Sequence, residues 1–84
     1  MKLKKEFVTH MDGEQQMMVD TSARFSGLVR NNKTAAFIVE LLKTDTTKDK
    51  IIEAMLNKYD VEESVVRNDV RRTIKTLKDI GALE

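Results

Sequence analysis

The side chains that could serve as nucleophile, base or metal ligand are few and widely spaced along this chain. There is no cysteine and one histidine, so thiol nucleophiles, disulfides and thiolate metal sites are excluded. His10 lies in a predicted strand with no second catalytic group at a suitable spacing, which favours a solvated histidine over a general base. We therefore expect that the chain is not an enzyme by itself.

Two carboxylates, Asp45 and Asp49, flank the predicted start of a helix. Negative charge at this position interacts favourably with the helix dipole. No third or fourth ligand follows at the spacing of a metal site, so the structural interpretation is favoured over a metal-binding one. The glycines stand alone rather than in a phosphate-binding loop, and we expect neither a metal nor another cofactor.

A predicted helix carries basic residues at intervals that place them on one face: Arg67, Arg71, Lys75 and Lys78. A winged-helix protein could set such a face in the major groove of DNA, against phosphates and guanine edges. However, the formal net charge is only +1 and acidic residues share the helix, so nucleic acid is not the expected partner. DNA binding is kept as the alternative function, and sequence-specific binding would need a homodimer to read two half-sites.

Length and composition indicate one small folded domain over residues 1–84. Apolar residues make up 40% of the chain and charged residues 35%, which is typical of a globular domain. The basic start, residues 1–10, is not followed by the apolar stretch of a signal peptide. No apolar run approaches the ~20 residues of a membrane helix. We expect a cytoplasmic protein without membrane attachment.

The elements that must position these side chains change in type along the chain. Alternating apolar and polar residues predict strands over residues 3–11, 15–21 and 25–30, with a reversal at Asp12–Gly13 and a turn at 21–24. Apolar residues at helical spacing then predict three helices, which follow from residue 32 onward. Strands first and helices afterwards indicate an α+β fold, winged helix-turn-helix-like, with a three-stranded antiparallel meander followed by a three-helix bundle.

Capping residues set the expected ends of the helices. Asn32 is the predicted N-cap of the first helix, and Thr47 is that of the second, because both side chains can accept an unpaired backbone N–H. The third helix is expected to begin at Asp60 or a neighbour. Gly81 is its predicted C′ residue, where a left-handed backbone suits glycine.

The third predicted strand, residues 25–30, has a partner on only one side, because nothing later in the chain has a strand pattern. Its centre is uncharged, and Arg24 and Arg30 flank it, although sheet edges are usually protected by charge. At Gly27 a second backbone could approach closely. The edge can therefore accept an extended peptide by β-augmentation, unless Gly27 merely marks a bulge.

Four short motifs occur in a characteristic order: Asn-x-Thr-Ala at residues 32–35, a capped helix at Thr47, Asp69–Val70, and Gly-x-Leu at 81–83. With the segments around them, "NKTAAFIVELL", "TTKDKIIEAMLNKYDV" and "VRNDVRRTIKTLKDIGALE", they resemble the PqqD-like peptide chaperones, also called RiPP recognition elements. The resemblance covers nearly the whole chain and is strongest from Asn32 to Leu83.

The resemblance implies that the protein binds the leader region of a ribosomally synthesised precursor peptide and presents it to a modifying enzyme, often a radical SAM maturase. The leader is expected to add as a strand beside the third strand, in a cleft walled by the third helix. Carried over by position, the peptide-binding residues are Phe25, Ser26, Gly27, Leu28, Val29, Arg30, Val66, Asp69, Val70, Thr73, Ile74 and Leu77. A purely structural subunit that docks onto the enzyme through its helices is a further alternative.

Two positions depart from the family pattern. Asn31 stands where the family usually has leucine, and we expect it to loosen the corner between strand and helix. Thr73 stands where a bulky apolar residue is common, which predicts a wider or more polar cleft.

The helix residues also have a structural interpretation, since Val66, Val70 and Leu77 form a core stripe. Asp69 and Thr73 lie toward one flank of that stripe and Ile74 toward the other. The pattern leaves open which flank faces the strand. Arg30 and Asp69 are candidates for reading charges on the leader, with ordinary surface groups as the alternative.

Overall fold

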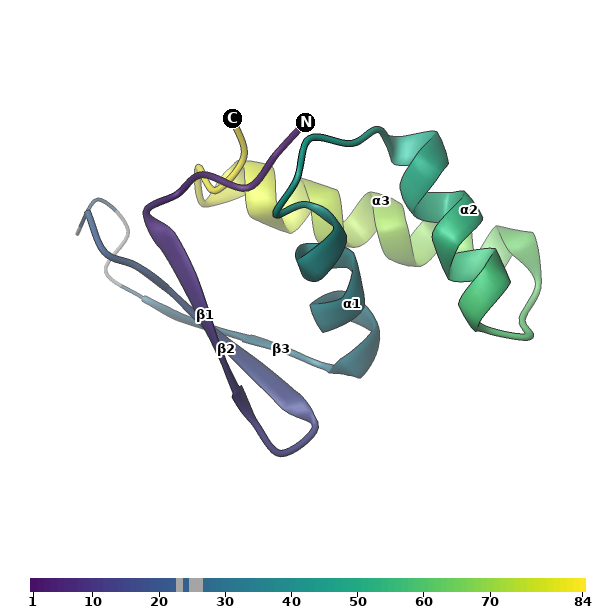
Figure 1. Cartoon of the computed structure of the whole chain (residues 1–84), viewed down its shortest axis with the longest axis horizontal. Coiled ribbons are helices and arrows are strands. Elements are labelled where there is room, and N and C mark those ends of the chain that lie inside the picture. The colour runs from purple at the N-terminus through teal and green to yellow at the C-terminus, as the bar shows by residue number, and fades with distance from the viewer. Residues whose placement is uncertain (23, 25–26) are drawn as a thin grey trace.

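The computed structural model describes residues 1–22, 24 and 27–84. Within this part of the chain, the elements are β1 (Phe7–Asp12), β2 (Gln15–Asp20), β3 (Leu28–Asn31), α1 (Lys33–Leu41), α2 (Lys48–Lys58) and α3 (Glu63–Asp79). The strands form one antiparallel sheet in the order β1-β2-β3, and the helices lie together on one side of it (Figure 1). The predicted α+β, winged-helix-like meander and helical bundle are confirmed.

The first strand begins later than the alternation predicted. Leu3 forms only an isolated bridge with Leu83, and the regular ladder starts at Phe7. The backbone N–H of Phe7 donates to the carbonyl of Lys4 at 3.1 Å, so a turn interrupts the extended chain between them. Leu3 is nevertheless buried, and its backbone N–H donates to the carbonyl of Leu42.

The third strand is shorter than predicted and is displaced toward α1. Within the described residues it runs from Leu28 to Asn31, one residue further toward α1 than the predicted range of 25–30, and its pairing with β2 ends at Leu28 opposite Val19. Gly27 lies in a bend before the strand, so it does not provide the close backbone approach expected at the strand's centre. Phe25 and Ser26 lie outside the described residues.

Both predicted N-caps are confirmed. The Asn32 side chain accepts the Ala35 backbone N–H at 2.8 Å at the start of α1, and Thr47 accepts the Lys50 N–H at 3.2 Å at the start of α2. The third helix starts at Glu63, later than the residue Asp60 that the sequence favoured.

The end of α3 has the geometry expected of a C′ glycine. Gly81 has φ +73°. Its N–H donates to the Lys78 carbonyl at 3.0 Å, and the Ala82 N–H donates to the Leu77 carbonyl at 2.8 Å. These two bonds make a Schellman motif, which satisfies carbonyls that the helix leaves unpaired. Ala82 is fully buried, so the motif also returns the chain to the core.

The core lies between the sheet and the three helices. Phe7 and Met18 supply large buried side chains from the sheet. The helices contribute apolar stripes at the spacing that the sequence predicted, and the buried members include Ile38, Val39, Ile51, Met55, Val66, Val70 and Leu77. None of the helices in the described part of the chain is long and apolar enough to cross a membrane.

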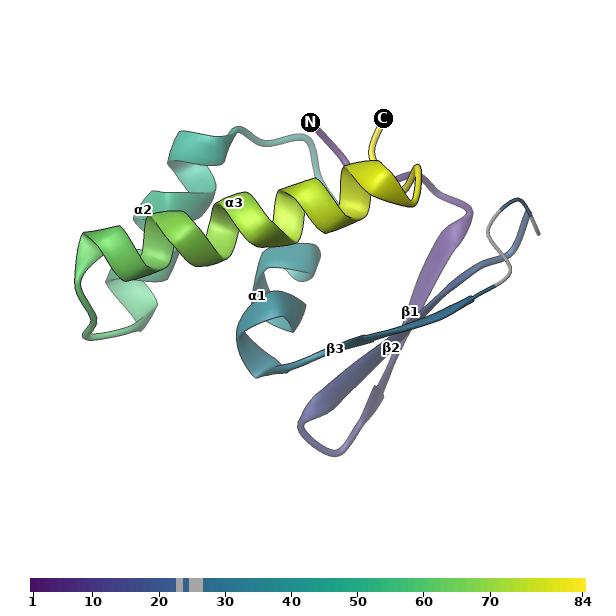
Figure 2. The ribbon, with the colours of Figure 1, turned by 180° about the vertical axis from the view of Figure 1, so that it is seen from behind.

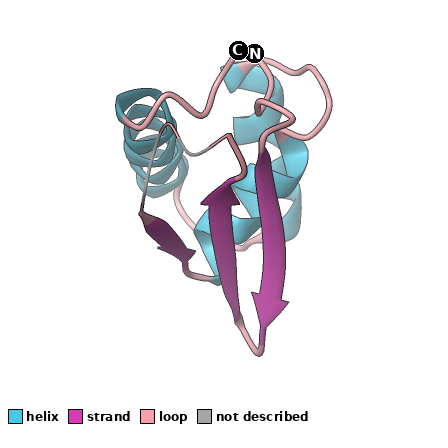
Figure 3. Ribbon diagram, turned by 90° about the vertical axis from the view of Figure 1, so that its left-hand side faces the viewer, coloured by secondary structure: helices cyan, strands magenta, loops and turns pink. Residues whose placement is uncertain are grey.

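The three helices do not cover the sheet evenly. α1 packs against β2, β3 and α3, whereas the Cα atoms of α3 and β3 stay more than 8 Å apart. Figure 2 shows both α3 and β3 on the near side of the molecule. Figure 3, in which the left-hand side of Figure 1 faces the viewer, again places them on one side, with α3 above β3. The edge strand and the last helix therefore lie on the same side of the molecule.

Candidate functional site

The outer edge of β3 is the natural starting point, because β3 pairs only with β2. Antiparallel strands turn the N–H and C=O groups of alternate residues toward the partner and away from it. Half of the four residues of β3 therefore direct their backbone groups outward. Among the described residues, no strand lies on that side to pair with them.

The side chains of β3 alternate between the two faces of the sheet. Val29 and Asn31 face the helices, opposite the buried residues Met18 and Gln16 of β2. Leu28 and Arg30 point to the face that the helices leave uncovered, and both are exposed. Any strand added beside β3 would have the same two faces.

A cleft of about 430 Å³ lies between β3 and α3. Val29, Ala35 and Leu77 provide its apolar surface. The remaining lining is polar and comes from β3, the β3–α1 corner and α3: Arg30, Asn31, Asn32, Thr34, Asp69, Arg72, Thr73 and Thr76. This is the volume range of sites that hold small ligands or segments of peptide.

The wall that α3 presents to this cleft is one helical face. Asp69, Arg72, Thr73 and Thr76 follow at intervals of three, one and three, so they stack along the helix. The flank of α3 toward the strand is therefore the one that carries Asp69 and Thr73. This resolves the question that the sequence left open, and it gives the cleft a polar wall.

The charged groups at the cleft differ in whether they are already paired. The Arg72 guanidinium donates to the Asp69 carboxylate at 2.7 Å, so these two charges offset each other. Arg30 has no ion-pair partner within the described residues. Of the two candidates for reading charge, Arg30 is thus the one whose charge is available to a ligand.

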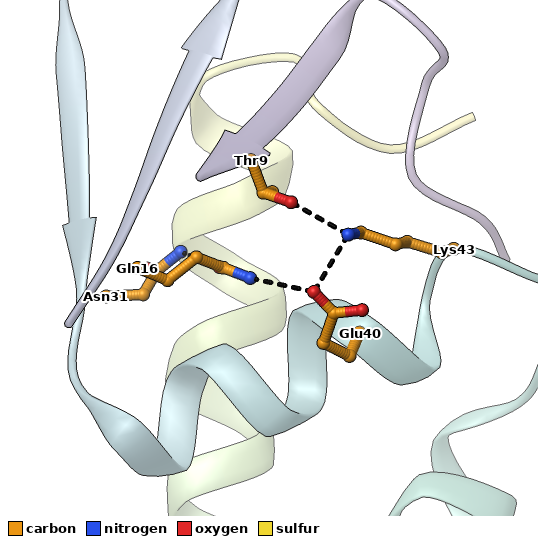
Figure 4. Close-up of polar contacts among 5 residues, drawn as sticks. All are labelled: Thr9, Gln16, Asn31, Glu40 and Lys43. Carbon is orange, nitrogen blue, oxygen red and sulfur yellow. Dashed lines mark hydrogen bonds and ion pairs between the residues drawn. The ribbon is translucent and has the colours of Figure 1, made fainter. Parts of the chain in front are cut away.

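A chain of polar contacts holds the corner where β3 turns into α1 (Figure 4). The Asn31 amide donates to Gln16 Oε1 at 2.9 Å, and Gln16 Nε2 donates to Glu40 Oε1 at 3.2 Å. Lys43 Nζ donates to the same Glu40 oxygen at 2.8 Å and to Thr9 Oγ1 at 2.7 Å. Gln16 and Asn31 are both buried, so their mutual hydrogen bond pairs polar groups that burial removes from water and that would otherwise lack a partner.

The Asn31 side chain, which departs from the family pattern, therefore has a hydrogen-bond partner in this chain. The sequence predicted that an asparagine in place of leucine would loosen the corner. Instead, its side chain is hydrogen-bonded to β2 and joins a contact chain that reaches α1 and β1. Since Asn31 also lines the cleft, this contact chain fixes one end of it.

The structure brings together only some of the residues predicted to bind peptide. Val29, Arg30, Asp69, Thr73 and Leu77 line the cleft. Leu28 is exposed on the same strand, and Gly27 precedes it. The helix residues that do not line the cleft are Val66, Val70 and Ile74. Val66 and Val70 are core residues, as their stripe indicated.

Ile74 lies on the opposite flank of α3. It lines a separate hollow together with Met1, Lys48 and Arg71. The predicted peptide-binding set missed Arg72 and Thr76 on the cleft side of α3, and it missed four lining residues at the β3–α1 corner: Asn31, Asn32, Thr34 and Ala35. The position of Arg72 and Thr76 on the same helical face as Asp69 was the signal that could have identified these two once the flank was known.

The basic row considered for DNA is engaged within α3 at three of its four positions. Arg67 donates to Glu63 at 2.7 Å, Arg71 to Asn68 at 2.6 Å and Lys75 to Asp79 at 2.9 Å. The hydrogen bond and charge of Glu63 raise the pKa of Arg67. These local pairs are typical of a solvated helix face.

The residues considered for metal and catalytic chemistry do not line the cleft. Across the residues that the structure describes, no group of three or more His, Cys, Asp or Glu side chains could hold a metal ion. Asp45 is engaged in a contact to the N-terminal ammonium group at 3.0 Å, whose hydrogen bond and charge lower the pKa of that carboxyl. His10 is exposed on β1. The cleft, with its open edge, is therefore the leading candidate site.

Two solved structures share this arrangement of elements. One is TbiB1 in complex with the TbiA(beta) leader peptide, which superposes with a TM-score of 0.84 at 19% identity over 100% of this chain and 95% of that chain. The other is a lasso peptide synthetase B1 complexed with the leader peptide, with a TM-score of 0.77 at 22% identity, covering 96% of this chain and 93% of that chain. At these identities the likeness establishes a common fold.

The sequence itself gives a family assignment. No curated protein matches it. The family model described as coenzyme PQQ synthesis protein D (PqqD) matches residues 10–83, a range that begins within β1 and includes β2, β3 and all three helices. The chain belongs to the PqqD family, as its motifs indicated.

Proposed function

We propose that this protein binds the leader region of a ribosomally synthesised precursor peptide and presents it to a peptide-modifying enzyme. The observation that carries the proposal is the unpaired outer edge of β3, which faces α3 across an open cleft. Membership of the PqqD family supports it. So do the two structures of the same fold, both of which are complexes with leader peptides.

In the proposed complex, the leader adds to the sheet as a fourth strand beside β3. We propose that the added strand occupies the cleft between β3 and α3, at the spacing of about 4.8 Å from β3 that neighbouring strands have. The leader's side chains would alternate between the α3 wall and the uncovered face of the sheet.

The backbone contacts alone give only part of the affinity. Two outward-facing residues of the four in β3 offer up to four hydrogen bonds, each worth about 0.5–1.5 kcal/mol net. Ordering a flexible peptide on binding costs about 2–5 kcal/mol, which offsets much of the free energy gained from these hydrogen bonds. Contacts between side chains must therefore supply the remaining affinity and decide which leader binds.

The role we assign is binding rather than catalysis. We propose that the enzyme partner supplies the chemistry, with a radical SAM maturase as the class that the family resemblance favours. A pull-down of that enzyme should be stronger with leader present than without it. Equal capture in both cases would instead support a structural subunit that docks through its helices.

The binding test uses the leader of the precursor peptide encoded next to this protein's gene, labelled with a fluorophore, and measures anisotropy. Thr76→Trp places a large side chain in the cleft, and we expect it to weaken binding at least about tenfold by blocking the strand's path. Lys78→Trp is the matched control, because it introduces the same side chain on the opposite flank of α3. Equal affinities for both variants and the wild type would contradict the proposed site.

A further inference from the structure

The uncovered face of the sheet carries an apolar row that runs across all three strands and stops at the open edge. Val8 pairs with Val19, and Val19 pairs with Leu28. Directly opposite residues of antiparallel strands point to the same face. The three side chains are 46%, 39% and 51% exposed, in that order, so no described part of the chain covers this row.

The next row on this face ends in a positive charge. His10 pairs with Met17, and Met17 pairs with Arg30. The residue across from Arg30 within the sheet is thus apolar and offers no carboxylate. Arg30 also has no ion-pair partner elsewhere among the described residues, and it borders the cleft.

From these two rows we infer the chemical class of leader that fits, an inference that rests on the proposed function. We propose that the leader carries an acidic residue opposite Arg30 and an aliphatic residue opposite Leu28, both on its outward face. Leu28 and Arg30 are two positions apart on β3, so their counterparts are two positions apart on the leader. An antiparallel leader then reads acidic-x-aliphatic, and a parallel one reads aliphatic-x-acidic.

Each half of this pattern has a physical cause. An aliphatic side chain beside Leu28 extends the row from Val8 and removes apolar surface from water. A carboxylate beside Arg30 matches the planar guanidinium, which can donate two parallel hydrogen bonds. A basic residue at that position would instead place like charges directly opposite each other, which is unfavourable across strands.

The inward-facing leader residues have different surroundings. They meet the wall of α3, where Thr73 and Thr76 are polar and where Asp69 and Arg72 already pair. No unpaired charge on that wall selects an acid. The expected preference for a carboxylate is therefore confined to the outward position opposite Arg30.

The test is a selection of displayed random peptides on immobilised protein. The wild type should enrich peptides with an acidic and an aliphatic residue two positions apart. R30E should enrich Lys or Arg in place of the acid. R71E, which changes the net charge equally on the opposite flank of α3, should select the wild-type pattern.

The dissociation constants of one selected peptide and of its Glu→Lys counterpart are then measured on both the wild type and R30E, which gives a cycle of four values. On the wild type, the change to Lys should weaken binding about fivefold, the upper range for an exposed cross-strand charge pair, and on R30E the order should reverse. Circular dichroism of R30E checks that this exposed substitution leaves the fold intact.

The possible results separate this inference from the proposed function. The selected peptides could bind less tightly to Thr76→Trp and yet show no preference for an acidic residue, or a preference that R30E does not reverse. Either result would overturn the inference and leave leader binding standing. Failure to select any peptide that Thr76→Trp weakens would overturn both.

Discussion

The buried contact between Asn31 and Gln16 allows a sharp prediction about how this fold is held together beside the cleft. The two side chains meet through one hydrogen bond of 2.9 Å, and both are buried. Replacing Asn31 with Leu removes the donor and leaves Gln16 Oε1 without a partner. Replacing Gln16 with Met, a side chain of similar shape, removes the acceptor instead; it also removes the hydrogen bond from Gln16 to Glu40, a loss that is the same in the single and double variants.

The expected quantity is the coupling energy between the two substitutions. A buried polar group without a partner costs about 1–3 kcal/mol, whereas replacing both partners by apolar groups of similar shape can be nearly neutral. Each single variant leaves one buried group unpaired, so the double variant Asn31→Leu/Gln16→Met should be more stable than the sum of the two single losses predicts, by about 2 kcal/mol or more. In a domain of this size, each kcal/mol corresponds to a shift in Tm of about 4–8 °C.

The assay is urea denaturation of the wild type, the two single variants and the double variant, with unfolding monitored by the circular dichroism of the helices. A second cycle, which combines Asn31→Leu with Thr47→Ala at the distant cap of α2, is the control and should be additive. Additivity within about 0.5 kcal/mol in the Asn31–Gln16 cycle would refute the reasoning, because it would show that the contact contributes nothing measurable.

Three further predictions concern the helices. Gly81→Ala should lower the free energy of unfolding, measured in urea, by about 1–2 kcal/mol, because φ is +73° at this position; a Cβ there would meet no atom within 4 Å, so the cost comes from the backbone. Gly81→Asn should lower it less, and equal losses for the two variants would argue against a backbone origin. Thr47→Ala should cost about 0.5–2 kcal/mol in the same assay through loss of the cap on Lys50 N–H, whereas Thr47→Ser should retain most of the stability. The protein should not bind duplex DNA in an anisotropy assay, because Arg67, Arg71 and Lys75 are engaged with neighbours on α3. Salt-sensitive binding that Arg71→Ala weakens would instead support the DNA alternative.

Local patterns predicted the features that depend on neighbours in sequence. Asn32 and Thr47 were identifiable as caps because the N–H groups that they accept lie three residues away. The stripe of Val66, Val70 and Leu77 was identifiable because helical spacing alone places them together. The α+β order followed from the change in period between the strands and helices.

Features that depend on distant parts of the chain were not predictable in the same way. Asn31 is paired with Gln16, fifteen residues earlier, and only the register of β2 with β3 brings them together. The start of β3 depends on its pairing with β2, which ends at Leu28 opposite Val19 and which the alternation of residues 25–30 does not reveal. The orientation of α3 depends on its packing against α1, so the sequence could not choose between the flanks of Thr73 and Ile74.

The most direct measurement follows backbone amide exchange in ¹⁵N-labelled protein, with and without the leader of the neighbouring precursor peptide. If the leader adds as a strand, the outward-facing amides within residues 28–31 should become protected, with chemical-shift changes along the α3 face from Asp69 to Thr76. Protection confined to the opposite flank of α3, with the edge amides of β3 exchanging as before, would contradict strand addition at this edge.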